Sequence, residues 1–300
     1  MSNENDFEIT GDGIIKRYTG TEITIIIPRE IRGIIVRAIG EQAFCEKGLT
    51  SVVIPNSITE IGGYAFYNNQ LVSVVIPEGV TEISNCAFYE NQLTEIIIPN
   101  SVTKIGEFAF GNNLLTEAII PDSVTEIGWG AFVNNQLTKL AISENIIKIS
   151  EWSFGNNQLT NVTIPNSITK IGDYAFRKNQ LTNVVIPDSV TQIGSGAFSK
   201  NQLAEVIIPK SVTEIDVNTF NANQLTSIVI PESVTKINRG AFTENQLYTI
   251  IIYGKVFLPR KNQYPAFDNG FDDFYKSNKK RIGTYLFNGK EWSIKKWVKN

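Results

Sequence analysis

The sequence contains no histidine and only two cysteines in 300 residues. Histidine is the side chain whose ordinary pKa best suits proton transfer near neutral pH, and it is the commonest metal ligand in proteins. Its absence excludes Ser-His-Asp triads, Cys-His pairs and histidine-based zinc sites. No phosphate-cradling loop and no constellation of metal-ligating residues appears either, so we expect no metal and no cofactor.

The two cysteines, Cys45 and Cys86, are too far apart in the sequence pattern to form a disulfide. They lie about two repeats apart, and strands in a sheet are spaced by about 4.8 Å. Their separation of roughly 10 Å or more exceeds what a disulfide can bridge. We predict two free thiols that pack as small hydrophobic side chains.

Long apolar segments are also missing. The first residues, MSNENDF, have neither the basic nor the apolar part of a secretory signal. No apolar run approaches the length of about 18 residues that a membrane-spanning helix needs. We expect no membrane span, and either a cytoplasmic location or a leader that has been removed.

Charge is distributed unevenly along the chain. Residues 255–300 contain 11 Lys and Arg against 4 Asp and Glu, a net charge of +7. Because the whole chain has a net charge of −3, the remainder carries −10. This acidic remainder argues against nucleic acid as a partner.

A 22-residue unit, represented by LTNVVIPDSVTQIGSGAFSKNQ at residues 181–202, recurs nine times between Leu49 and Gln246. Counted from its leucine as position 1, the unit reads L-T-x-V-x-I-P-x-S-V-T-x-I-G-x-x-A-F-x-x-N-Q. A fixed period of this kind is typical of a solenoid, in which each coil packs against its neighbours.

The unit predicts the course of one coil. The alternation L-x-x-V-x-I predicts a short strand, which the proline at position 7 ends. S-V-T-x-I-G predicts a second extended piece, and the glycine at position 14 permits a turn. The following x-x-A-F suits a single helical or 3-10 turn. Positions 1, 4, 6, 10, 13 and 18 should point into the core, and the asparagine at position 21 should bond neighbouring backbone. The unit 137–158 has Ser143 for the proline and Ser153 for the alanine, so we expect a weak point or a bend of the solenoid there.

The signature I-P-x-S-V-T-x-I-G-x-x-A-F resembles the BspA-like leucine-rich repeats of bacterial and some protist surface proteins, over roughly residues 7–252. The resemblance implies a β-rich α/β solenoid wound as a right-handed superhelix, and adhesion or host and matrix protein binding at the cell surface. We divide the chain into an N-terminal cap with a first atypical repeat (1–48), the repeat array (49–252) and a C-terminal segment (253–300).

Both ends carry candidate caps. At the N-terminus a hairpin is expected around Gly11-Asp12-Gly13, followed by a first coil with five extra residues. In the C-terminal segment we predict a short amphipathic helix within 271–280 and a hairpin over 284–297 around Asn288-Gly289. A C-terminal α+β cap is the default for a solenoid end, and a small aromatic, basic recognition module is the alternative.

The resemblance places positions 3 and 5 of each strand on the concave surface, where a partner would bind. Position 3 varies, and position 5 is mostly β-branched, so the open surface should carry a continuous apolar stripe of the kind that marks an interaction face. The same residues could instead reflect β-propensity alone; we favour binding. The candidate residues are Ser51, Val53, Ser73, Val75, Glu95, Ile97, Glu117, Ile119, Lys139, Ala141, Asn161, Thr163, Asn183, Val185, Glu205, Ile207, Ser227 and Val229.

Two other surfaces are candidates. Aromatic side chains at positions 15 and 16 form a possible secondary patch, although we favour the interpretation that they shield the convex side: Tyr64, Phe108, Trp129, Trp152 and Tyr174. The repeated S-x-T pattern resembles an ice-binding array, but Glu and Lys at position 12 interrupt it. Hydroxyl ladders bonding along the coils are the simpler explanation.

No arrangement of residues indicates catalysis. Carboxylates such as Glu82, Glu126 and Glu214 recur at position 12 and alternate with Lys104 and Lys236, which is typical of an exposed, charge-compensated face. The sequence therefore predicts a non-enzymatic scaffold that binds protein through its concave face. The competing hypothesis is a structural spacer that associates with a second copy of itself.

Overall fold

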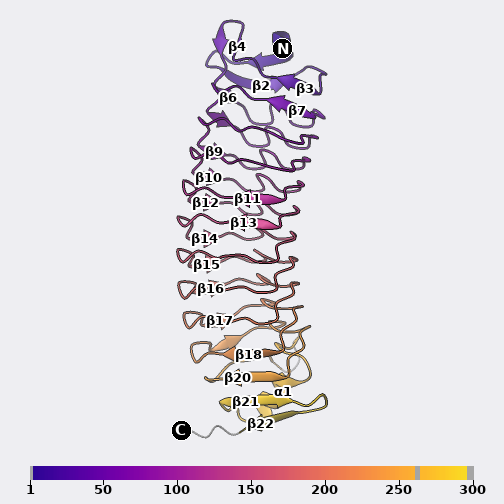
Figure 1. Cartoon of the computed structure of the whole chain (residues 1–300), viewed down its shortest axis with the longest axis vertical. Helices are drawn as coiled ribbons and strands as arrows, with labels where there is room; N and C mark the ends of the chain where they lie inside the picture. The colour runs from indigo at the N-terminus through magenta and orange to yellow at the C-terminus, as the bar shows by residue number, and fades with distance from the viewer. Residues whose placement is uncertain (1–2, 261–263, 296–300) are drawn as a thin grey trace. The chain divides into compact units, whose positions relative to one another are not determined.

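A computed structural model describes residues 3–260 and 264–295. The chain divides into two compact units, a first unit of Met1–Ile146 with Trp152–Gln158 and a second unit of Ile147–Glu151 with Leu159–Asn300. The division lies in the coil 137–158, the coil for which the sequence predicts a weak point. In each unit successive coils stack as a solenoid (Figure 1), so the predicted fold class is confirmed.

In several coils the first extended piece, around positions 3 to 5, forms parallel pairs with the same piece of the next coil. In the first unit, Ala118 pairs with Leu140, 22 residues later, and in the second unit Ile228 pairs with Ile250. The strands that form here are β3 (Thr24–Ile26), β7 (Ser51–Val53), β11 (Glu117–Ile119) and β13 (Lys139–Ala141) in the first unit, and β18 (Ser227–Ile230) and β20 (Thr249–Ile252) in the second.

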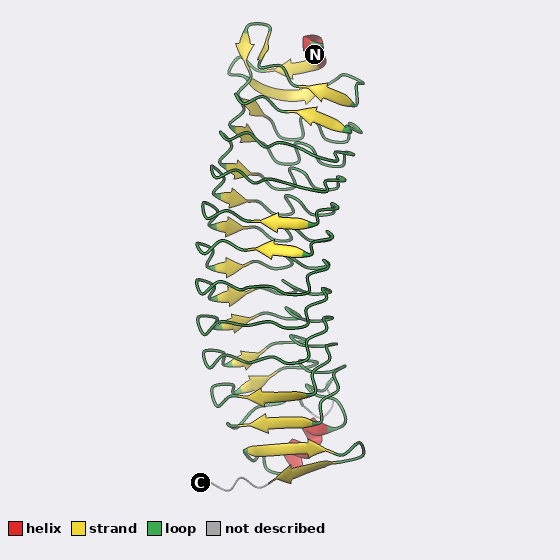
Figure 2. Cartoon of the chain, viewed as in Figure 1, coloured by secondary structure: helices red, strands yellow, loops and turns green. Residues whose placement is uncertain are grey.

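The second extended piece, at positions 12 and 13, forms a separate set of short parallel strands on another side of the coil (Figure 2). In the first unit these are β6 (Ala38–Ile39), β8 (Glu60–Ile61), β9 (Glu82–Ile83), β10 (Lys104–Ile105) and β12 (Glu126–Ile127). In the second unit they are β14 (Lys148–Ile149), β15 (Lys170–Ile171), β16 (Gln192–Ile193), β17 (Glu214–Ile215) and β19 (Lys236–Ile237).

The core is a row of stacked rings surrounded by aliphatic side chains. Phe198, for example, stacks on Phe176 at 5.6 Å between ring centroids and on Phe220 at 5.7 Å. The inward positions expected from the sequence are buried, apart from three half-buried side chains, Ile96, Leu140 and Ile142. One coil cannot bury its phenylalanine alone, so stacking of neighbouring coils creates the core.

Within each unit, a ladder of asparagines at position 21 ties neighbouring coils together. Asn201 accepts a hydrogen bond from the backbone N–H of Leu181 (3.0 Å) and donates to the carbonyls of Phe176 (2.9 Å) and Phe198 (3.1 Å). Its exposed fraction is 7%. These bonds satisfy buried backbone groups in the return to the next coil, so the predicted role of this asparagine is confirmed.

The segment after position 14 forms hydrogen-bonded turns and differs from the expected helical turn. Position 16 has a positive φ throughout, for example 56° at Tyr64 and 58° at Trp152, and a right-handed helix cannot contain such a residue. The glycine at position 14 also has a different role from the one predicted. A Cβ on Gly62 would lie 2.7 Å from the backbone nitrogen of Glu41, so the close approach of the neighbouring coil, and not a special φ, favours glycine at Gly62.

The coil 137–158 replaces its missing proline with side-chain hydrogen bonds. The Ser143 hydroxyl donates to the carbonyl of Val124 (3.0 Å) and accepts from the N–H of Asn145 (3.1 Å). The Asn145 amide donates to the carbonyl of Asp122 (2.7 Å). The turn is therefore held to the preceding coil by polar contacts.

The N-terminal cap consists of two hairpins, after a short 3-10 helix at Glu4–Asp6. Strand β1 (Phe7–Ile9) pairs antiparallel with β2 (Ile14–Tyr18) across the predicted glycine turn. The five extra residues form a second hairpin, β4 (Glu30–Ile31) with β5 (Ile34–Ile35). The Tyr18 ring lies 5.6 Å from that of Phe44 and so covers the first coil.

The C-terminal segment contains the predicted helix and hairpin. Helix α1 (Phe271–Ser277) precedes β21 (Gly283–Phe287) and β22 (Trp292–Lys295), which extend the sheet of β18 and β20 antiparallel. Phe267 continues the ring stack at 5.0 Å from Phe242, and Phe271 packs edge-on against it. The segment thus covers the last coil as a cap. The final residues of the predicted hairpin, 296 and 297, lie outside the described residues.

Candidate functional site

The strand face, defined as the surface formed by positions 3 and 5, carries a stripe of exposed aliphatic side chains. In the first unit, Val75 and Ile97 have exposed fractions of 80% and 83%. In the second unit, Val185 and Ile207 reach 72% and 81%. The remaining position-5 side chains are exposed as well: Val53, Ile119, Ala141, Thr163 and Val229.

The position-3 side chains flank this stripe and are all exposed: Ser51, Ser73, Glu95, Glu117, Lys139, Asn161, Asn183, Glu205 and Ser227. Between them, position 4 is buried or half-buried in every coil. The alternation places the residues that the sequence nominated on one surface within each unit. Whether that surface binds a partner is a prediction that follows below.

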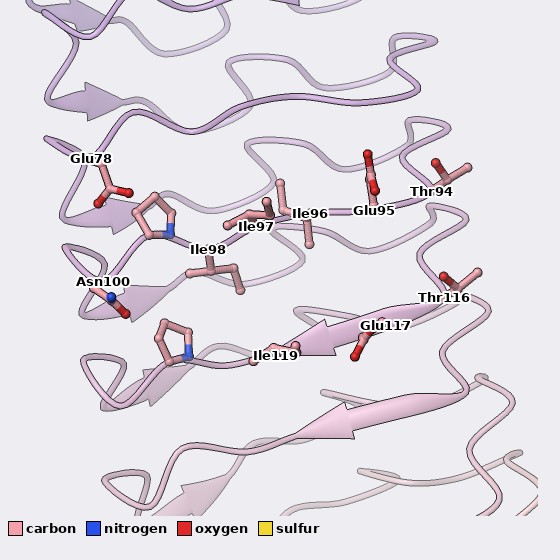
Figure 3. Close-up of a pocket in the computed structure, with 12 residues that line it drawn as sticks. Glu78, Thr94, Glu95, Ile96, Ile97, Ile98, Asn100, Thr116, Glu117 and Ile119 are labelled. Atoms are coloured by element: carbon pink, nitrogen blue, oxygen red, sulfur yellow. The ribbon is translucent and has the colours of Figure 1, made fainter.

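A hollow of about 510 Å³ lies on the strand face of the first unit. Figure 3 shows Ile97 and Ile119 on neighbouring coils, with the carboxylates of Glu95 and Glu117 toward one end of the strand pieces. Glu78 lies toward the other end, at position 8 of the preceding coil. This hollow is therefore apolar along its length and acidic at both ends.

A second hollow, of about 810 Å³, lies on the strand face of the second unit. Its lining includes Ile207, Val229, Pro231 and the ring of Tyr253, with Lys210 also present. Position 8 and Tyr253 were not among the residues nominated from the sequence. The hollow depends on side chains from adjacent coils, and a pattern read along one strand does not reveal such a neighbour.

The aromatic patch is partly assembled by the fold. The Phe108 and Trp129 rings lie 4.4 Å apart in the first unit. Trp152 is half-buried in the first unit, and Tyr174 belongs to the second, where its ring lies 5.5 Å from the Arg177 guanidinium. Two further rings, Tyr67 and Tyr89, join the patch and were missed, although their spacing of one repeat was visible in the sequence. They stand at position 19 of the repeat, whereas the predicted patch was confined to positions 15 and 16.

These rings cover backbone, in agreement with the shielding that the sequence suggested. A Cβ on Gly130 would lie 2.6 Å from the Phe108 ring, and one on Gly196 would lie 2.6 Å from the Tyr174 ring. Each ring thus occupies the space above a position-16 glycine of the following coil. Two other rings of the patch, Tyr64 and Trp129, are about two-fifths exposed, at 40% and 41%.

The position-12 face pairs its charges at the surface. Lys104 lies 3.6 Å from Glu82 and 3.8 Å from Glu126, and Lys236 lies 2.7 Å from Glu214. The hydrogen bond from Lys236 lowers the pKa of the Glu214 carboxyl, and the same bond raises the pKa of Lys236. These exposed pairs match the charge-compensated face that the sequence predicted.

The remaining chemistry is sparse. Burial raises the pKa of both free thiols, Cys45 and Cys86, which makes them poor nucleophiles. Across residues 3–260 and 264–295, no three His, Cys, Asp or Glu side chains group so as to hold a metal ion. In the same part of the chain, no helix has the length and apolar character needed to cross a membrane.

Threonine hydroxyls at position 11 form the expected ladder; for example, Thr191 donates to the carbonyl of Thr169 (3.3 Å). The serines at position 9 behave differently. Ser101 and Ser211 donate to a carbonyl of the preceding coil at 2.7 and 2.5 Å. Five others have a buried hydroxyl without a hydrogen-bond partner among the described residues: Ser57, Ser123, Ser167, Ser189 and Ser233.

The pattern of the BspA type leucine rich repeat region matches residues 37–159 and 147–263, with six copies. The chain belongs to this family. Its fold is similar to that of a leucine-rich repeat protein from Bacteroides ovatus, with a TM-score of 0.67 and 26% identity, covering 82% of this chain and 76% of that one.

A leucine rich cell surface protein from Faecalibacterium prausnitzii is similar with a TM-score of 0.55 and 28% identity, covering 82% of this chain and 86% of that one. A leucine-rich repeat protein of T. pallidum has a TM-score of 0.51 and 26% identity, covering 66% and 88%. Among curated proteins, no relative matches this BspA-type chain.

Proposed function

We propose that this BspA-type repeat protein is a non-enzymatic scaffold that binds another protein through its strand face. The observation that carries the proposal is the aliphatic stripe at position 5, where Val75, Ile97, Val185 and Ile207 are between 72% and 83% exposed. Soluble proteins rarely leave contiguous apolar surface of this kind uncovered unless something binds there. Leucine-rich repeat proteins generally bind proteins, and the family is generally non-enzymatic.

The partner is expected to bring apolar side chains to the centre of the stripe and polar groups to its edges. In the first unit, the hollow with Ile97 and Ile119 is bordered by Glu95 and Glu117, which suits a partner with basic groups beside an apolar contact. An adhesive role at the cell surface is the finer form of this proposal. The similarity to a cell surface protein from Faecalibacterium prausnitzii supports that location.

The experiment replaces the apolar stripe with charge and keeps a matched control. In the test variant, Val75→Lys, Ile97→Lys and Ile119→Lys place three ammonium groups on the strand face. The control variant places three lysines in the second extended piece of the same three coils. They replace the exposed threonines at position 11: Thr81, Thr103 and Thr125. We expect host or matrix proteins that the wild type captures to be lost by the test variant and retained by the control.

Capture that is unchanged in the test variant would refute the strand face as the binding surface. Static light scattering of the wild type separates a second copy from a different partner. If the stripe is covered by self-association, the measured mass will rise with concentration, and the three strand-face lysines will return it to that of a monomer.

A further inference from the structure

A second surface, distinct from the strand face, consists of five rings that contact one another in sequence. We name it the aromatic ridge: Tyr64, Tyr67, Tyr89, Phe108 and Trp129. The Tyr64 and Tyr67 centroids lie 5.8 Å apart, and Tyr67 stacks on Tyr89 at 5.9 Å. Tyr89 and Phe108 follow at 5.2 Å, and all five rings belong to the first unit.

The ridge is only partly covered by the protein itself. Its two end rings, Tyr64 and Trp129, are exposed, and the three between them are half-buried. The Asn112 amide donates to the Tyr89 hydroxyl (2.9 Å), which holds that ring in place. One side of the ridge therefore lies against the protein, and its outer side is open to solvent along the row of rings.

Carboxylate side chains lie around the aromatic ridge. The repeat positions that form the ridge supply no Lys or Arg to neutralise these carboxylates. The pKa of the Tyr64 phenol is raised first by its hydrogen bond with Cys86 and further by the negative charges of Glu41 and Glu107. Burial raises the pKa of Tyr67, and the charges of Glu90 and Glu46 add to that effect. In the four coils from residue 49 to 136, positions 15, 16, 19 and 20 contain neither Lys nor Arg. Aromatic faces next to unpaired negative charge attract cations.

The second unit shows how a ring at these positions receives a cation. Arg177, at position 19, places its guanidinium 5.5 Å from the centroid of Tyr174, at position 16. The corresponding positions of this unit also carry Lys178, Lys200 and Arg239. In the second unit the chain supplies its own cation to the ring, whereas the ridge of the first unit has rings and carboxylates without one.

We propose that the aromatic ridge binds an extended, arginine-rich segment of a partner protein. A guanidinium can stack on an aromatic face and pair with a carboxylate at once, which an ammonium does less well. Alternate side chains of an extended peptide lie about 6.7 Å apart. Successive ring centroids of the ridge lie between 4.4 and 5.9 Å apart, a difference that the long arginine side chain can span. Alternate arginines would therefore reach neighbouring rings, with Glu90 and Glu107 beside them.

The test uses the full chain and a fluorescent eight-residue peptide of alternating arginine and serine, followed by anisotropy. The ridge variant combines Glu90→Gln and Glu107→Gln, which leaves the rings intact. The control combines Glu95→Gln and Glu117→Gln on the strand face, with the same change in net charge. We expect the ridge variant to bind about tenfold more weakly and the control to stay within about twofold of the wild type.

A ring variant, Trp129→Leu, should weaken binding by about fivefold and keep the wild-type circular dichroism spectrum, because the side chain is exposed. An equal loss in both glutamine variants would mean diffuse attraction to an acidic protein and would overturn the proposal. So would ridge-dependent binding of a neutral oligosaccharide without binding of the arginine peptide. Self-association of the wild type that the ridge variant abolishes would identify a second copy as the occupant and would also overturn it.

Discussion

The asparagine ladder makes a quantitative prediction about how neighbouring coils are held together. In the change Asn201→Ala, the N–H of Leu181 loses the one acceptor that the structure gives it, at 3.0 Å. The carbonyls are affected less, because Phe176 also accepts from Asn179 (3.1 Å) and Phe198 also accepts from Asn223 (3.0 Å). The main cost is thus one buried, unpaired N–H.

The expected loss in the free energy of unfolding follows from the hydrogen bonds that Asn201→Ala removes. A buried donor without a partner costs about 1–3 kcal/mol, and weakening two carbonyls that keep one bond each adds about 1 kcal/mol. We expect a total of about 2–4 kcal/mol, measured as a shift of the urea midpoint. Hydrogen exchange should show faster exchange at the amide of Leu181, since local opening becomes easier.

The matched control is Asn183→Ala in the same coil, where the side chain is exposed at position 3. It should change stability by less than about 0.5 kcal/mol. A further variant, Asn201→Asp, keeps the acceptor but loses the donors and faces two carbonyl oxygens with a negative charge, so it should be worse than alanine. If Asn201→Ala and Asn183→Ala cost the same, the ladder does not hold the coils and the reasoning is wrong.

Three more predictions concern single side chains. Gly196→Ala should lower the free energy of unfolding by about 2–4 kcal/mol, because φ is +60° and the new Cβ would lie 2.6 Å from the Tyr174 ring. The control Gly63→Ala, whose new Cβ would have its nearest contact at 3.5 Å, should keep the free energy of unfolding within about 1 kcal/mol of the wild type. Ser189→Ala should leave the urea midpoint unchanged or raise it, because its buried hydroxyl has no partner, whereas Ser211→Ala should cost about 1 kcal/mol through its lost hydrogen bond. Burial raises the pKa of Asp272 above its ordinary 3.8, so the native state holds this proton more tightly than the unfolded chain, and stability should fall as the pH rises through the range between those two values. Asp272→Asn should remove that part of the pH profile of the unfolding midpoint.

Each of these has a result that would contradict it. Equal effects of the two glycine variants would remove the steric argument, and equal effects of the two serine variants would show that the hydroxyl bond contributes nothing. A pH profile that is the same with aspartate and with asparagine at position 272 would show that this carboxyl does not titrate on unfolding.

The repeated part of the fold could be predicted from the sequence because each inward position recurs with the period. Leu181, Ile193 and Phe198 are buried as expected, since stacking is the one way in which a short coil can bury them. The irregular coil was visible for the same reason: Ser143 and Ser153 interrupt the pattern in the coil where the chain divides into two compact units. Local exceptions to a strict period are easy to detect.

The turn after position 14 could not be predicted in the same way. Aromatic side chains such as Tyr174 give no sign of a positive φ, which is usually associated with glycine or asparagine. The same positive φ recurs at this position whatever the residue, as at Cys86 and Asn218, so the repeat geometry and not the side chain sets it. The hollows of the strand face were missed for a related reason, since residues at positions 5 and 8 of different coils line them together.

The asparagine ladder also limits how such a protein can change its length. Each asparagine bonds the coil before it and its own coil, so the smallest piece that can be removed without breaking the ladder is a whole unit. Deleting residues 181–202 would join Gln180 to Leu203, whose N–H already bonds Asn223 (3.0 Å). Deleting one residue would turn the following strand piece inside out. Recombination between repeats can therefore shorten or lengthen the array in whole units, and a frame-preserving loss of a few codons cannot.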